Sequence, residues 1–319
     1  EYLMESPVLN AEEKKKFGDI RYGRAGKIEV MRSLQILSEF LSKYYNKSVI
    51  LLIDEYDVPM ARATSNGYYK EMLEIMKGFM QALKDNQCIK LAVITGCLKI
   101  AKESIFTGTN NFVSNTITSS RLNEYYGFVQ NEVDRILEDA EIKGKGDIMK
   151  KWYDGYHFGD VDVYCPWDVM CYVDDLQKNP NAKPDEYWKD TSDNVIIRSF
   201  IDYAGASITK KLETLMNGGY IIQRVDENLT YDYLHSSEEN LWSLMYLTGY
   251  LTQVRDYKID DDWQDNMVAL KIPNLEIKQI FETEVSKWFE DSSKKWNRTE
   301  LFSSVWSEDC DKITKEVSA

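Results

Sequence analysis

The chain has few histidines, no C-x-x-C cysteine pair and no long apolar run, and each of these absences excludes a class of protein or site. His157 and His235 are its only histidines, which excludes a histidine-rich metal site. None of its 5 cysteines forms a C-x-x-C pair, so we expect reduced thiols in a cytoplasmic protein. No hydrophobic stretch approaches the roughly 20 residues that a membrane-spanning helix needs, and we therefore expect no membrane partner.

Positive charge is also scarce. The 39 Lys and Arg residues face 53 Asp and Glu residues, which gives a formal net charge of −14 at pH 7. This balance argues against binding of nucleic acid over the whole surface, although it leaves room for a local basic patch. The 319 residues, 43% of them hydrophobic, are enough for two or three domains with sizeable cores.

Five apolar residues, Val49 to Ile53, run directly into Asp54 and Glu55. Such a run predicts a strand that is buried on both faces of a parallel sheet. Carboxylates at its carboxyl end lie where open α/β sheets bind their ligands. This pattern is typical of the Walker B motif of ATPases, in which the Asp helps to hold Mg²⁺ and the Glu polarises the attacking water. Taken alone, the stretch fits equally well a core strand whose exit is solvated by acids.

A second buried strand is predicted from Ile89 to Thr95, and Lys99 follows it closely. Around these strands the spacing of apolar residues predicts helices at 11–17, 29–45 and 67–85 and a third strand at 112–118. In ATPases, the strand beside Walker B ends in a polar sensor residue that detects the γ-phosphate, and Thr95 and Lys99 are suitably placed. The alternative is that Thr95 caps the turn and Lys99 is a solvated charge.

Beyond Gly127 the sequence becomes mainly helical. Helices are predicted at 130–140, 147–153, 166–177 and 192–217, and another begins at 275. We interpret the aromatic stretch 152–159 as a packed turn between helices, with a binding groove as the alternative. The segment 220–275 mixes short strands with a helix near 239–248, which is the outline of a winged helix. Because the first residues of that helix include no Lys or Arg, we expect it to pack against protein rather than read DNA.

Long blocks of the sequence resemble, in the same order, the bacterial AAA-ATPase-like family. The blocks are Leu51–Pro59, Ile94–Gly108, Glu124–Phe128, Lys151–Tyr156 and Leu270–Asn274. The resemblance covers nearly all of residues 1–290. It implies a P-loop NTPase core, a helical lid and a winged-helix-like segment, commonly followed by a PD-(D/E)XK nuclease-like domain.

The resemblance also implies roles for single residues. Asp54 would be the Mg²⁺-associated carboxylate and Glu55 the carboxylate that activates water, with ATP and Mg²⁺ as cofactors. Members of the family usually have Arg where this chain has Lys99, and a lysine keeps the charge but lacks the bidentate fork.

The phosphate-binding Walker A loop, Gly-x-x-x-x-Gly-Lys-Ser/Thr, does not occur in the sequence. The nearest approach is Gly23 to Lys27, but its glycines are three apart and Ile28 replaces the hydroxyl residue. In the family this loop lies upstream of what is here Glu1. We therefore expect a fragment that holds the hydrolysis half of a site and binds ATP weakly or not at all.

Together these patterns predict an α/β region followed by mostly α structure. The expected division is a partial P-loop ATPase-like core with an incomplete parallel sheet (1–128), a helical lid-like domain (129–219), a winged-helix-like segment (220–275) and the start of a truncated C-terminal region (276–319). In the intact parent, ATP hydrolysis would drive movement of the lid and the C-terminal domains. The alternatives are a nucleotide-independent interaction scaffold or the ATPase part of a DNA-processing nuclease effector.

The expected partner is an unidentified protein or a second copy of the chain. Nucleic acid is expected only through a nuclease-like domain downstream. Glu276-Ile277-Lys278 matches half of a nuclease signature, but it opens an amphipathic helix, so we interpret the match as coincidence.

Overall fold

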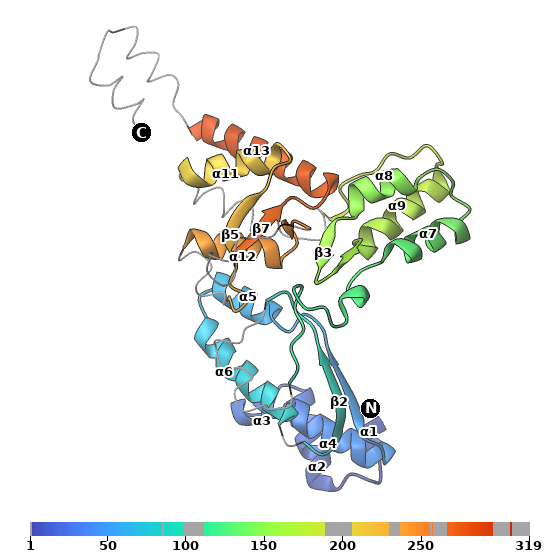
Figure 1. Ribbon diagram of the computed structural model, residues 1–319. Coiled ribbons are helices and arrows are strands. Elements are labelled where there is room, and N and C mark those ends of the chain that lie inside the picture. The colour runs from blue at the N-terminus through green and yellow to red at the C-terminus, as the bar shows by residue number, and fades with distance from the viewer. Residues whose placement is uncertain are drawn as a thin grey trace. The chain divides into compact units, whose positions relative to one another are not determined.

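The computed structural model has a mixed α/β fold that is mostly helical (Figure 1). It describes residues 2–84, 86–98, 112–188, 206–229, 237–255, 257, 267–295 and 307. The chain divides into two compact units. Unit 1 comprises Glu1–Asn123, Phe158–Asp160 and Ile222–Leu270, and unit 2 comprises Glu124–His157, Val161–Ile221 and Lys271–Ala319. The division into four segments that the sequence suggests stays a prediction.

The first half of unit 1 alternates helices with two strands. Its elements are α1 (Tyr2–Glu5), α2 (Ala11–Arg21), α3 (Lys27–Met31), α4 (Ser33–Tyr45), β1 (Val49–Ile53), α5 (Val58–Ser65), α6 (Tyr69–Met80), the 3₁₀ turn η1 (Gln81–Leu83) and β2 (Ile89–Ile94). The predicted strands and helices are confirmed here, except that the helix expected at 29–45 is divided at Arg32. A capping box begins α2. Asn10 Oδ1 accepts the Glu13 N–H at 2.9 Å, and Glu13 Oε2 accepts the Asn10 N–H at 2.8 Å.

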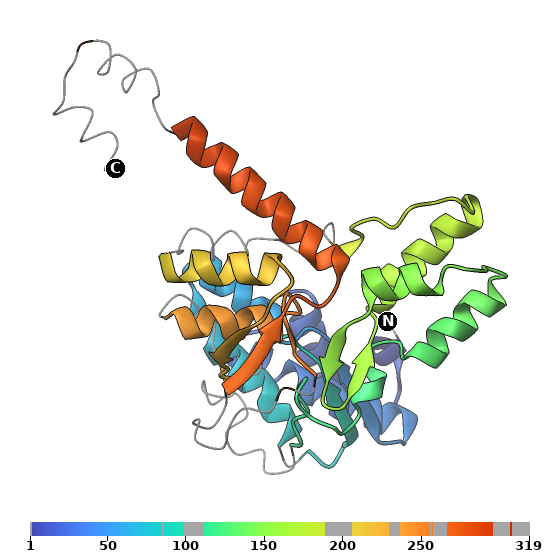
Figure 2. The same ribbon diagram turned by 45° about the horizontal axis from the view of Figure 1, so that its top comes forward.

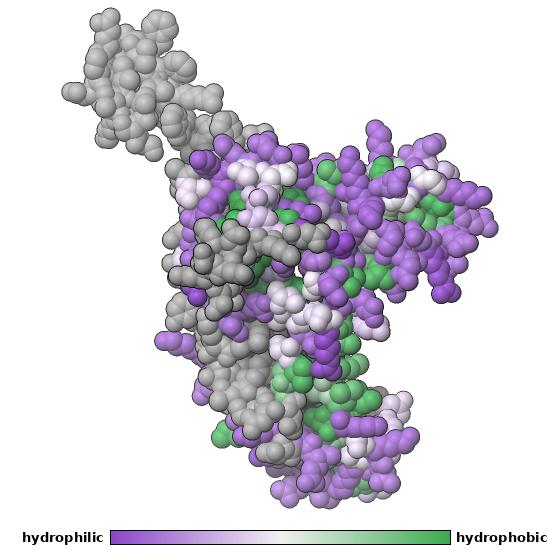
Figure 3. Space-filling view, viewed as in Figure 1, coloured by the Kyte–Doolittle hydropathy of each residue, from purple (hydrophilic) through white to green (hydrophobic). Residues whose placement is uncertain are grey.

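β1 and β2 pair in parallel, and one face of this small sheet is partly buried while the other is exposed. On the covered face, Ile53 and Ile94 pack against a cluster from α5, α6 and the strand exit that contains Tyr56, Met60, Tyr69, Met76 and Met80. The opposite face carries the paired residues Ile50–Leu91 and Leu52–Val93, which are 46–72% exposed. Figure 3 shows hydrophobic side chains gathered over these strands. The prediction of a strand buried on both faces is therefore wrong.

The strand predicted at 112–118 is also wrong, because this segment has no regular structure. Its polar groups bond elsewhere within unit 1. The hydroxyls of Thr116 and Thr118 donate to the Glu227 carboxylate at 3.0 and 2.6 Å, and Ile117 O accepts the Gly159 N–H at 2.8 Å. These long-range bonds replace the strand ladder that the β-branched residues suggested.

The second half of unit 1 contains a helix and three short strands. They are β5 (Ile221–Arg224), α12 (Glu238–Leu247), β6 (Thr252–Gln253) and β7 (Met267–Lys271), and the sheet order is β5-β7-β6. The predicted helix is confirmed, and Trp242 and Met245 on it are fully buried. Burial of so many side chains of one helix favours a structural role for α12. The winged-helix interpretation stays a prediction.

Unit 2 consists mainly of helices, together with most of one β-hairpin. Its elements are η2 (Asn123–Tyr125), α7 (Gln130–Asp139), α8 (Gly146–Tyr153), β3 (Tyr156–Phe158), β4 (Val161–Val163), α9 (Pro166–Lys178), α11 (Ala206–Met216) and α13 (Leu275–Lys295). The predicted helices are confirmed where they are described, and residues 192–205 lie outside the described part. Figure 2 shows α13 as one continuous helix. Glu276 is an acidic residue in its first turn.

The aromatic stretch 152–159 differs from the predicted turn, since it contains strand β3 of a hairpin. The hairpin turns at Gly159, whose φ of 56° favours glycine. Tyr153 is completely buried, as expected for a packed segment. In the described part of the chain, no helix combines the length and apolarity needed to cross a membrane.

Candidate functional site

The carboxyl ends of β1 and β2 meet at the same edge of their sheet. Ile53 pairs with Ile94, so Asp54 and Thr95 are the next residues along the two strands. The Thr95 N–H donates to Ile53 O at 2.9 Å, which continues the pairing beyond the strands. The prediction that these two strands lie side by side is therefore confirmed.

Asp54 is exposed and accepts two hydrogen bonds through one oxygen. The Thr95 hydroxyl and the Glu55 N–H, the latter at 3.1 Å, both donate to Asp54 Oδ1. Asp54 Oδ2 has no hydrogen-bond partner among the described residues. One carboxylate oxygen is thus available for a ligand, such as a water molecule bound to Mg²⁺.

Glu55 is exposed, and its backbone adopts a left-handed conformation with φ of 51°. For a residue with a side chain this conformation costs roughly 1–2 kcal/mol. It ends the strand abruptly, and Val58 N–H bonds back to Glu55 O at 3.1 Å as α5 begins. Strained non-glycine residues of this kind are concentrated at functional sites, so the conformation agrees with a functional role for Glu55.

Asp57 and Tyr56 form contacts that the sequence analysis did not assign. Asp57 is 2% exposed, and its two oxygens accept the N–H groups of Cys97 at 3.2 Å and Leu98 at 3.0 Å. The Tyr56 hydroxyl donates to Leu98 O at 2.7 Å. Residues just after β1 therefore form hydrogen bonds to the loop that follows β2. The sequence shows an acid two residues beyond Glu55. It does not show that this acid is buried, because its partners are about 40 residues away.

Cys97 lies in that loop, close to the acids. Partial loss of hydration raises the pKa of its thiol, and the negative charges of Asp57 and Glu55 raise it further. A thiol with a raised pKa is mainly protonated at neutral pH, so Cys97 is not an activated nucleophile.

The remaining predicted site residue, Lys99, lies outside the described residues. In the part of the chain that the structure describes, no group of three or more His, Cys, Asp or Glu side chains could hold a metal ion.

A second acidic cluster lies inside unit 2. Asp168 in the first turn of α9 and Glu276 in the first turn of α13 are both 0% exposed. Burial, followed by the neighbouring Asp168, raises the pKa of Glu276 to about 9, and burial also raises the pKa of Asp168. The Trp188 N–H donates to Glu276 Oε1 at 2.8 Å. No cation from the described residues offsets the charge of these two acids, so burial favours a protonated form of the pair, and we interpret the pair as a structural feature of unit 2.

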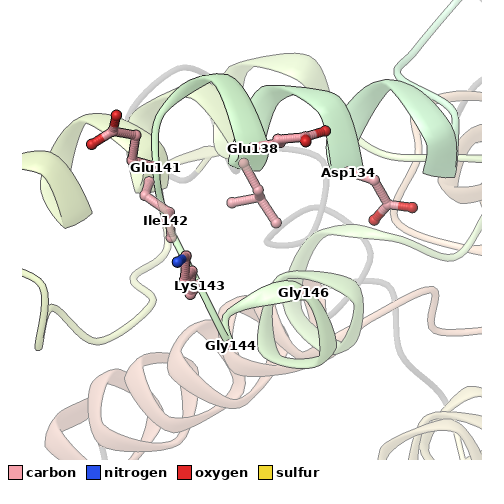
Figure 4. A pocket seen from close by; sticks show the side chains of 8 residues that line it. Asp134, Glu138, Glu141, Ile142, Lys143, Gly144 and Gly146 are labelled. Atoms are coloured by element: carbon pink, nitrogen blue, oxygen red, sulfur yellow. The ribbon is translucent and has the colours of Figure 1, made fainter.

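A surface depression of about 820 Å³ lies beside α7 and the turn to α8 (Figure 4). Three carboxylates, Asp134, Glu138 and Glu141, contribute to its lining together with Lys143. This excess of negative charge would repel phosphate groups, so the depression does not supply the phosphate-binding part of an ATP site.

Comparison with known proteins gives one family. Residues 6–106 match the model of the AAA-ATPase-like family, described as a predicted AAA-ATPase. The matched region contains β1, β2 and the residues at their ends, and it supports the resemblance found in the sequence.

A relative in Azotobacter chroococcum mcd 1 is described as an uncharacterized protein in the vnfD 5′ region. It is 26% identical over 233 residues, which cover 72% of this chain and 41% of the relative. This chain therefore spans less than half the length of that relative. No solved structure matches the chain.

Proposed function

We propose that the cluster at the ends of β1 and β2 is the hydrolytic half of an ATP site that works in a longer parent protein. Asp54 would interact with Mg²⁺ through water, Glu55 would polarise the attacking water, and Thr95 would act as the polar sensor. The observation that carries the proposal is the hydrogen bond from the Thr95 hydroxyl to Asp54 across two adjacent parallel strands.

The chemistry of the available groups supports these roles. The free oxygen of Asp54 suits a hard cation, and Glu55 is exposed where a water molecule could reach it. ATP-bound Mg²⁺, when present, would neutralise the charge that develops on the phosphate oxygens. Lys99 is proposed to sense phosphate, and the Walker A loop would be supplied by the parent. Hydrolysis there would move the lid-like and C-terminal regions.

The test is the ATPase rate of the full-length protein compared with its Glu55→Gln variant. Loss of a general base lowers rates by roughly a hundredfold or more, and that is the expected result. Glu71→Gln is the matched control, because Glu71 is an exposed acid on α6 of the same unit. Equal rates for Glu55→Gln and the wild type would remove Glu55 from the mechanism.

A second candidate function is a nucleotide-independent interaction scaffold. The exposed apolar residues Ile50, Leu52, Leu91 and Val93 favour it, because a parallel sheet normally has both faces covered. The sequence of the parent upstream of Glu1 discriminates between the two. A strand followed by a Gly-rich loop with Lys-Ser/Thr supports the ATPase, and its absence supports the scaffold.

A further inference from the structure

Asp57 occupies a helix N-cap position without acting as a cap. It directly precedes α5, where aspartate side chains normally accept an N–H of the first helical turn. Its side chain makes no such bond. Both oxygens instead bond to the loop after β2, at Cys97 N and Leu98 N. A carboxylate that follows one strand and accepts two N–H groups from the loop after another strand holds these two chain segments together.

The neighbours of Asp57 hold the same loop at further points. The Tyr56 N–H donates to Thr95 O at 3.0 Å, and the Tyr56 hydroxyl donates to Leu98 O at 2.7 Å. Between these points Gly96 lies so close that an added Cβ would be 2.6 Å from both Asp57 Oδ1 and the Tyr56 ring. The loop from Thr95 to Leu98 is therefore fixed at both ends and packed in its middle.

This fixed loop begins with the residue that contacts Asp54. Thr95 bonds to Asp54 through its side chain and to Tyr56 through its carbonyl, so the fixed backbone keeps its Cβ where a side-chain rotamer can place the hydroxyl on Asp54. We propose that Asp57 is a positioning residue of this site, which fixes the β2 exit loop and thereby keeps the Thr95 hydroxyl within hydrogen-bonding reach of Asp54. The catalytic consequence of this arrangement rests on the proposed function, whereas the holding of the loop does not.

The first experiment needs no ATPase activity. In Asp57→Asn the side chain keeps its shape but has one acceptor oxygen instead of two, since the amide nitrogen cannot accept a hydrogen bond. Hydrogen exchange, resolved to single amides, should show at least a tenfold loss of protection at Cys97 or Leu98, with β1 amides unchanged. Asp54→Asn is the matched control, because it makes the same chemical change three residues away without touching either amide.

A second readout uses the Cys97 thiol. Removing the charge of Asp57 should lower the pKa of Cys97, which shifts the pH profile of alkylation to lower pH. Cys97 is already exposed in the wild type, so any rise in its labelling rate on the alkaline plateau, where the thiol is fully ionised, would report a further opening of the loop. Site-resolved mass spectrometry separates Cys97 from the other cysteines. A shifted profile with an unchanged plateau, together with wild-type amide protection, would overturn the inference.

Gly96→Ala tests the same loop if Asp57→Asn does not fold. Its methyl group would push the loop away from Asp57 and Tyr56, so Cys97 and Leu98 should again lose protection. Wild-type protection in this variant would contradict the close packing on which the inference depends.

In the full-length protein, Asp57→Asn should lower kcat for ATP about tenfold and leave KM nearly unchanged, because it disturbs positioning rather than binding. If the protein hydrolyses no ATP but the variant loses amide protection, the proposed function fails and the holding of the loop stands. If Glu55→Gln abolishes hydrolysis while Asp57→Asn changes neither protection nor kcat, the inference fails alone.

Discussion

Asp168 and Glu276 are neighbours in the interior of unit 2, and both side chains are completely buried. Both oxygens of Asp168 and Oε2 of Glu276 have no hydrogen-bond partner among the described residues. Asp168 lies in the first turn of α9 and Glu276 in the first turn of α13, so the pair brings together residues that are 108 positions apart in the sequence. In the part of the chain that the structure describes, the titratable groups around them are Cys165, Cys171, Tyr153 and Tyr156, and none of these is a cation. Because no positive charge among these neighbours offsets two buried carboxylates, we expect the folded state to retain a proton on the pair.

The first prediction is that unit 2 loses stability as the pH rises. The folded pKa of Glu276, about 9, lies above its ordinary value of 4.5, so the folded state binds more protons than the unfolded state between these values. The contribution of Glu276 is complete below about pH 4.5 and is lost as the pH rises through about 9. The expected slope is about 1.4 kcal/mol per pH unit inside this window. Urea unfolding at several pH values, followed by hydrogen exchange in α9 and α13, measures it.

Glu276→Gln should flatten this slope. The glutamine amide could donate to the neighbouring Asp168 at every pH, and its oxygen can still accept the Trp188 N–H. Glu282→Gln on the exposed side of α13 is the control and should keep the wild-type slope. A Glu276→Gln protein with an unchanged slope would show that the pair does not hold the proton.

The second prediction concerns the left-handed backbone of Glu55. Glu55→Gly and Glu55→Ala remove the same carboxylate, but only glycine adopts a φ of 51° without strain. We expect the glycine variant to be more stable than the alanine variant by about 1 kcal/mol in urea unfolding. Equal stabilities, or a more stable alanine variant, would mean that this backbone conformation stores no strain.

The third prediction uses two consecutive residues of β1. Leu52 is 72% exposed, whereas Ile53 packs against the cluster around Tyr56 and Met60. Leu52→Ala should change the free energy of unfolding by less than about 0.5 kcal/mol, as is usual for surface positions. Ile53→Ala should cost about 2 kcal/mol, because it leaves a cavity. Equal losses in thermal or urea unfolding would show that the outer face is covered in solution, for example by self-association.

Much of this region could be predicted from the sequence, because the signals are local. The apolar run from Val49 to Ile53, and the alternation of strand, helix and strand, placed Asp54 and Thr95 at one sheet edge. The exposure of Leu52 could not be predicted. A continuous apolar run looks the same whether its outer face is covered or not.

The features that were missed depend on partners far away in the sequence. Thr116 and Thr118 have high strand propensity, yet they bond to Glu227, more than 100 residues away. The hydrogen bond from the Leu98 N–H to Asp57 and the Asp168–Glu276 pair also connect residues that are far apart in the sequence. The hairpin of β3 and β4 did have a local signal, since Gly159 and Asp160 stand between aromatic and β-branched residues.

The last prediction separates the two interpretations of Thr95. If its hydroxyl orients Asp54, Thr95→Val, which keeps the shape and removes the hydrogen bond, should lower kcat of the full-length protein roughly tenfold or more. Thr95→Ser keeps the hydroxyl and should stay within a few-fold of the wild-type kcat. The difference between the two variants excludes a simple packing effect, since serine loses the methyl group that valine retains. If valine instead supports the wild-type rate, Thr95 only ends the strand, and the hydrogen bond to Asp54 has no part in hydrolysis.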